Sequence, residues 1–143
     1  MSKKRNVAAL STAAFLTVCV ISGGAAKAQL APVADPNGSF SGNIDGHTIA
    51  LPVLCTRYAD ILDISSHNQV ISNNTTTGGV EPALNIKAFE TGFQIVVFVA
   101  GERYKIMRAR DTLETFPFSL AREVKASGIG KIEVDFEITC PEL

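Results

Sequence analysis

The run Ile132-Glu133-Val134-Asp135-Phe136-Glu137-Ile138-Thr139-Cys140 decides the fold class of this chain. Apolar and polar side chains alternate along it, and successive side chains of a β-strand point to opposite faces of a sheet. One face therefore carries four large apolar side chains and Cys140 toward a core, whereas the other carries carboxylates toward water. The run predicts a β-strand in a sheet with one solvated face.

The same two-residue period appears earlier in the chain. An extended segment after Asp45-Gly46 places four side chains on one face, namely Ile49, Leu51, Val53 and Cys55. Asp-Gly is a dipeptide favoured in tight hairpin turns, and Glu90-Thr91-Gly92 indicates a second hairpin. Residues 93–100 are apolar on both faces, which predicts a central strand covered on both sides.

Together these segments predict an all-β domain, either a small β-sandwich or a partly closed barrel of six to seven short strands with one core disulfide. Ser119 in an N-cap position and Gly128 beyond the last turn indicate one short helix near residues 119–127. Residues 39–143 suffice for one hydrophobic core and are too few for two domains. Residues 29–38, with little apolar content, predict a flexible lead-in.

Residues 1–28 have the three zones of an export signal. Basic residues at positions 3–5 precede the apolar run 7–21, and Ala26-Lys27-Ala28 supplies the small residues that a signal peptidase recognises. The apolar run is shorter than the roughly 20 residues that cross a bilayer. We therefore expect cleavage between Ala28 and Gln29, no membrane span after processing, and a periplasmic or secreted protein.

Cys19 offers an alternative route of processing. Leu16-Thr17-Val18-Cys19 has the leucine and cysteine of a lipoprotein box, but such a box carries a small residue before the cysteine, and Val18 is not small. We interpret Cys19 as an apolar residue of the signal. Lipidation at Cys19 would instead tether the protein to the cell envelope.

Loss of the signal makes the protein acidic. Residues 1–28 contain four of the 13 basic residues and none of the 14 acidic ones, so residues 29–143 carry nine basic and 14 acidic groups, a net charge of −5. An acidic surface repels phosphate backbones, which argues against a nucleic-acid partner.

Of the three cysteines, Cys55 and Cys140 remain after cleavage. An even number of cysteines in an exported chain predicts a disulfide, and both residues fall on the apolar face of their strand. The two cysteines and two histidines lack the ligand spacing of a zinc site. We therefore expect a core bridge, no metal and no cofactor.

Several short motifs resemble the mycobacterial nineteen-kilodalton lipoprotein antigen family. They are Ile44-Asp45-Gly46, Val53-Leu54-Cys55-Thr56, residues 61–64, Arg103-Tyr104-Lys105-Ile106 and Phe136-Glu137-Ile138-Thr139-Cys140. The resemblance spans residues 43–140 in patches. It implies a cell-envelope or secreted β-domain with a Cys55–Cys140 bridge and no established enzymatic role.

Catalytic groups are not expected. His47 and His67 fall in turns, near Asp45 and Asp63, but a nucleophilic site also needs a positioned serine or cysteine. No Gly-x-Ser-x-Gly motif is present and the cysteines are assigned to the bridge. We interpret both histidines as solvated turn residues.

A local basic segment has two interpretations. Residues 103–110 contain Arg103, Lys105, Arg108 and Arg110, four of the nine basic residues expected after cleavage. They could form an anion or partner patch, or they could pair across strands with the carboxylates of the C-terminal run. We favour cross-strand pairing, because charge ladders are ordinary on sheet surfaces.

The sequence thus predicts a non-enzymatic exported binding domain, similar to a surface antigen, whose partner is a protein. The alternative is a periplasmic inhibitor or immunity protein that blocks an enzyme.

Overall fold

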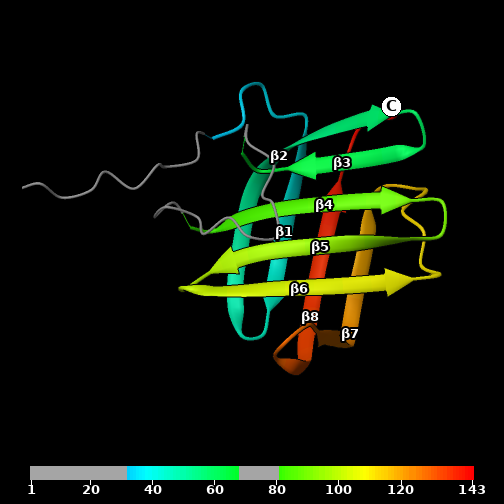
Figure 1. The fold of residues 1–143 in the computed structure, drawn as a ribbon. Coiled ribbons are helices and arrows are strands. Elements are labelled where there is room, and N and C mark those ends of the chain that lie inside the picture. The colour runs from blue at the N-terminus through cyan, green and yellow to red at the C-terminus, as the bar shows by residue number, and fades with distance from the viewer. Residues whose placement is uncertain (1–31, 68–80) are drawn as a thin grey trace, which may run out of the picture.

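The computed structural model describes residues 32–67 and 81–143, which form eight antiparallel strands and no helix. The strands are β1 (Gly38–Ile44), β2 (His47–Tyr58), β3 (Ile61–Ser65), β4 (Ala83–Phe89), β5 (Gly92–Val99), β6 (Glu102–Ala109), β7 (Phe118–Ala126) and β8 (Gly130–Thr139). Each strand pairs with the next, and β8 pairs with β1, so the sheet closes into an up-and-down barrel (Figure 1). The all-β class is confirmed, and of the two expected architectures the barrel forms, fully closed and with eight strands instead of six to seven.

Both predicted hairpins are confirmed, since β1 pairs with β2 across Asp45-Gly46 and β4 pairs with β5 across Glu90-Thr91. Asp45 and Gly46 have φ angles of 51° and 85°, as a two-residue turn matched to strand twist requires. Ala100 and Gly101 repeat the arrangement between β5 and β6, with φ angles of 52° and 78°. These turns let consecutive strands run side by side, which generates the meander seen in Figure 1.

The core lies inside the barrel and is built from alternate residues of the strands. The apolar residues of the C-terminal run, Ile132, Val134, Phe136 and Ile138, are at most 3% exposed, which confirms the alternation. Phe40 of β1 stacks on Phe136 of the neighbouring β8, with ring centroids 5.1 Å apart. Large inward side chains therefore fill the interior, as is usual for eight-stranded barrels.

Strand β5 is buried on both faces, as its sequence predicts. Its inward residues belong to the barrel core, whereas Val96 and Phe98 form a second buried cluster with Ala83 on the outer face of β4 and β5. β4 and β6 pair with its two edges. It is a central strand.

The helix expected near residues 119–127 was wrong, because this segment forms β7. It pairs with β8 along its whole length, from Phe118↔Ile138 to Ala126↔Gly130. Ser119 is a strand residue, and Gly128, with φ of 80°, belongs to the turn before β8. Pairing with β8 outweighs the helix propensity of this segment, a common tertiary override.

Residues 32–37 contact the barrel before β1 begins. The Val33 N–H donates to the Ser66 carbonyl at 3.3 Å, and Val33 is buried. The Asn37 side chain donates to the Cys55 carbonyl at 3.0 Å and accepts from the Cys55 N–H at 2.7 Å. The expected cleavage site at Ala28–Gln29 and Cys19 lie outside the described residues.

Candidate functional site

The barrel has two ends that differ in composition. One end, called here the disulfide end, contains the last residues of β2, β4, β6 and β8 together with the segment 110–117 that connects β6 to β7. The opposite end carries the short turns at Asp45-Gly46, Ala100-Gly101 and residues 127–129, and the connection from β3 to β4 also leaves from that end of its strands. The cysteines and the connection 110–117 thus lie together at the disulfide end.

The predicted bridge is confirmed between Cys55 and Cys140, whose Cα atoms are 5.9 Å apart. Cys55 is 2% exposed and packs in the core, whereas Cys140 follows the end of β8 and is only partly buried. β2 and β8 do not pair with each other, because β1 lies between them. The bridge therefore spans β1 and fixes three strands at one end of the barrel.

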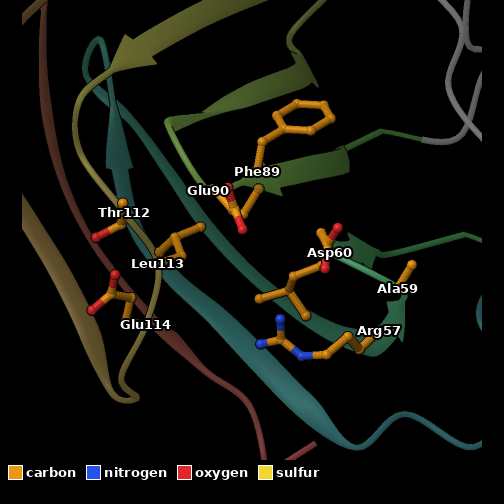
Figure 2. Close-up of a pocket in the computed structure, with 10 residues that line it drawn as sticks. Arg57, Ala59, Asp60, Phe89, Glu90, Thr112, Leu113 and Glu114 are labelled. Carbon is orange, nitrogen blue, oxygen red and sulfur yellow. The ribbon is translucent and has the colours of Figure 1, made fainter.

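Two adjoining cavities, each about 290 Å³, open at the disulfide end and share Arg57 and Glu114. The first extends between the β2–β3 and β4–β5 hairpins, and Figure 2 shows Arg57 extending from β2 toward the segment that carries Leu113. The second extends past Phe116 to the C-terminal residues 140–143. Leu113 is 5% exposed and belongs to the core cluster, so it forms a buried apolar part of the first cavity's wall.

The cavities carry both charge and apolar surface. Carboxylates of Asp60, Glu90 and Glu114 surround Arg57 in the first cavity, yet the Arg57 side chain makes no hydrogen bond or ion pair to another described residue. Exposed apolar side chains stand at the same hairpins: Tyr58 at 65%, Ile61 at 38% and Phe89 at 43%. Sequence reasoning missed this site, because its residues come from three separate connections and from the C-terminal residues.

The predicted basic patch divides between the two faces of β6. Arg103 and Lys105 lie on the outer face, whereas Tyr104 and Ile106 are fully buried, so the predicted alternation is confirmed. Arg108 forms an ion pair with Asp111. The favoured pairing with Glu133, Asp135 and Glu137 was wrong, because β7 lies between β6 and β8. The carboxylate of Glu123 on β7 instead pairs with Lys131 of β8 at 2.6 Å.

The two histidines lie in different surroundings. His67 is 4% exposed, so its interpretation as a solvated residue was wrong; its Nδ1 lies 2.7 Å from the Ser66 hydroxyl. That hydroxyl also accepts from the Leu84 N–H at 2.8 Å, which ties it to β4. Burial lowers the pKa of His67. Asp63 shares a small outer cavity with His67, and burial raises its pKa.

His47 lies instead beside Tyr104 at the opposite end of the barrel, with ring centroids 6.2 Å apart. The Tyr104 hydroxyl donates to Glu102 at 2.6 Å and lies 3.3 Å from an oxygen of Asp45. The bond to Glu102, burial and the two negative charges all raise the pKa of Tyr104. The cluster therefore holds a neutral phenol that closes this end of the core.

Among residues 32–67 and 81–143, no group of three histidine, cysteine or acidic side chains could hold a metal ion. In the same ranges no helix has the length and hydropathy needed to cross a membrane. No protein-family model, no curated protein and no solved structure matches this chain.

Proposed function

We propose that this chain is a non-enzymatic, exported binding domain that holds a partner protein at the disulfide end. The pair of cavities around Arg57 carries the proposal. Binding sites combine apolar walls with a few polar groups that set orientation, and here Tyr58, Ile61 and Phe89 stand beside a guanidinium that no described residue engages.

Because side chains fill the interior, we expect a partner protein to contact the outside of the barrel. An eight-stranded barrel is just wide enough for side chains to fill or for one small ligand, and here the inward residues Phe40, Phe93, Ile95 and Ile106 are at most 2% exposed. The rim of the disulfide end is the surface where cavities, charge and exposed aromatic side chains coincide. Aromatic and arginine side chains are enriched at protein interfaces.

Export is supported by the zones of residues 1–28 and by the Cys55–Cys140 bridge, since disulfides persist in oxidising compartments. The resemblance to the nineteen-kilodalton antigen family supports a place in the cell envelope or outside it. Ser66 and His67 are both buried, and the Ser66 hydroxyl accepts from the Leu84 N–H at 2.8 Å, so their contact supports a structural role and not a nucleophilic one.

The test is affinity capture with matched surface variants. The processed protein and its Phe89→Ser and Ile129→Ser variants are immobilised and exposed to an envelope extract of the native cells. Both side chains are exposed, at 43% and 48%, but Ile129 lies at the opposite end. We expect a protein that the wild type and Ile129→Ser retain and Phe89→Ser loses.

Equal retention by all three proteins would contradict the proposed surface. If the captured protein is an enzyme whose turnover stops when the domain is added, the inhibitor alternative replaces the general binding role. Turnover by the domain itself would refute a non-enzymatic function.

A further inference from the structure

The barrel closes through few backbone pairs between β6 and β7, and the junction of these two strands is called here the seam. The two strands pair at one position, Ile106↔Ala126, and the Ser127 N–H donates to the Lys105 carbonyl beside it at 2.8 Å. By contrast, β6 pairs with β5 along its full length, and β7 does the same with β8. Each strand therefore has one paired edge and one edge that is open beyond this junction.

The connection between the two strands does not cover these open edges with backbone bonds. Within residues 110–117 of the described chain, only the Arg110 N–H takes part in such a bond, donating to the Thr91 carbonyl at 2.7 Å. Beyond the backbone bonds at this junction, alternate residues on the edges of β6 and β7 thus point N–H and carbonyl groups away from their paired neighbours β5 and β8. Open strand edges are templates for an added strand.

The core below the seam is closed by aromatic packing. Phe118 of β7 meets Phe93 of β5 edge to face, with ring centroids 5.6 Å apart. Leu113, from the connection between the two strands, is buried in the same core cluster as Phe93. A strand that added at the seam would therefore lie on the surface of a finished core, and it would not have to enter the barrel.

Arginines border the seam in an unusual position. Arg122 is exposed, although its neighbours in the same row, Leu120 and Val124, are buried and its partner across the ladder is the buried Val134. Arg108 likewise stands opposite the buried Phe93, and its side chain is 21% exposed. Both positions belong to the inward rows, and the divergence of the strands lets their charges reach water.

The seam is basic on a chain whose formal net charge is −1. The basic residues along it are Lys105, Arg108, Arg110, Arg122 and Lys125. Two nearby carboxylates, Asp111 and Glu123, are already paired, with Arg108 and Lys131 respectively. Arg110 and Arg122 make no side-chain bond to another described residue.

We propose that the β6–β7 seam binds an extended acidic segment of a partner polypeptide as an added strand. Main-chain bonds to an open edge supply affinity in this mode of recognition, and side chains supply specificity. The cations of the seam repel basic strands and attract an acidic one. The basic side chains of the seam line neither cavity at the disulfide end, so this surface goes beyond the proposed function.

The test uses the peptide acetyl-TEVEVET-amide and its matched form with every glutamate replaced by lysine. Binding is measured by isothermal titration and by amide hydrogen exchange of the full processed protein. We expect the acidic peptide to bind and to slow exchange at residues 107–109 and 118–125. Arg110→Gln and Arg122→Gln should each weaken binding by about two- to fivefold, the value of one exposed ion pair.

Lys87→Gln is the matched control, since it removes one positive charge from β4, away from the seam and from both cavities, and should leave the affinity unchanged. Equal binding of the lysine peptide, equal weakening by Lys87→Gln, or binding without slower exchange at β6 and β7 would each overturn the proposal. Protection of these edges by self-association, without peptide, would assign the seam to a second copy of the chain and refute the acidic partner. Capture at the disulfide end can succeed or fail independently of all these results.

Discussion

A Cβ atom at Gly38 would stand 2.7 Å from the Sγ atom of Cys55, and it would come still closer to the Thr139 carbonyl oxygen. The disulfide therefore crosses β1 at a residue that has no side chain. Gly38 pairs with Val53, and its neighbour Ser39 pairs with Thr139, so the strands on both sides hold its backbone in place. The bridge and the closure of the barrel between β8 and β1 depend on this one glycine.

Gly38→Ala should destabilise the domain by about 1–3 kcal/mol, the usual cost of overpacking. The added methyl group meets both a sulfur and a backbone oxygen, and neither can move without shifting a strand. Urea unfolding measures the change. The same substitution in the Cys55→Ala/Cys140→Ala background should cost less, because the sulfur is gone. Equal stability of Gly38→Ala and the wild type would contradict the crossing.

Replacing Cys55 and Cys140 together by alanine should cost about 2–5 kcal/mol, the usual effect of removing a disulfide from a small exported domain. The bridge closes a long loop, since the two cysteines are 85 positions apart. In the wild type, a thiol reagent should label neither residue after unfolding without reductant. Labelling of either one would show that the bridge is absent from the protein.

Tyr104 should remain a neutral phenol above the pH at which tyrosine usually ionises. Its pKa is raised by the bond to Glu102 and by burial, so its stabilising effect is complete below pH 10, the ordinary pKa, and is lost as the pH rises further. In Tyr58→Phe, Tyr104 is the remaining one of the two tyrosines of the chain. The ultraviolet absorbance of this variant should show no phenolate at pH 10 while the protein stays folded.

Tyr104→Phe tests the same hydroxyl through stability. It removes a hydrogen bond to a carboxylate, which should cost about 1.5–3 kcal/mol. A variant as stable as the wild type, or a normal phenolate titration in the folded protein, would show that the hydroxyl is not held by Glu102.

Asp63→Asn should stabilise the domain at neutral pH. Burial raises the pKa of Asp63 above 3.8, although Lys87 and the hydrogen bond from Asn85 oppose the shift. Folding therefore disfavours the charged carboxylate relative to the unfolded chain, so the stabilising effect of the neutral acid is present below pH 3.8 and lost as the pH rises through the folded pKa. Asparagine keeps an acceptor for the Asn85 amide, which donates to Asp63 at 3.1 Å.

Thermal unfolding should show a higher midpoint for Asp63→Asn than for the wild type at pH 7, and a smaller difference at pH 3. Asp60→Asn changes the net charge equally at an exposed hairpin position and serves as the control. If Asp63→Asn lowers the midpoint at pH 7, the charged form of Asp63 stabilises the fold and the predicted sign is wrong.

Local sequence pattern specifies three features of this protein: the buried face of its last strand, its first hairpin and its disulfide. Alternation along residues 132–140 specifies which side chains are buried, because the period of a strand is two whatever it pairs with. Asp45-Gly46 specifies a hairpin, because both turn residues must adopt positive φ angles. Two cysteines on apolar faces, together with the expectation of export, sufficed to predict their bridge, which the structure confirms.

The number of strands, the closure of the barrel and the candidate sites follow from tertiary contacts. Residues 118–126 have helix-forming side chains, and the whole ladder with β8 makes them a strand. The pairing of β1 with β8 joins residues about a hundred positions apart, and local pattern contains no information about such contacts. Arg57 and Glu114 line the same cavities because closure of the barrel brings the β2–β3 and β6–β7 connections to one end. The divergence of β6 from β7 likewise depends on tertiary contacts.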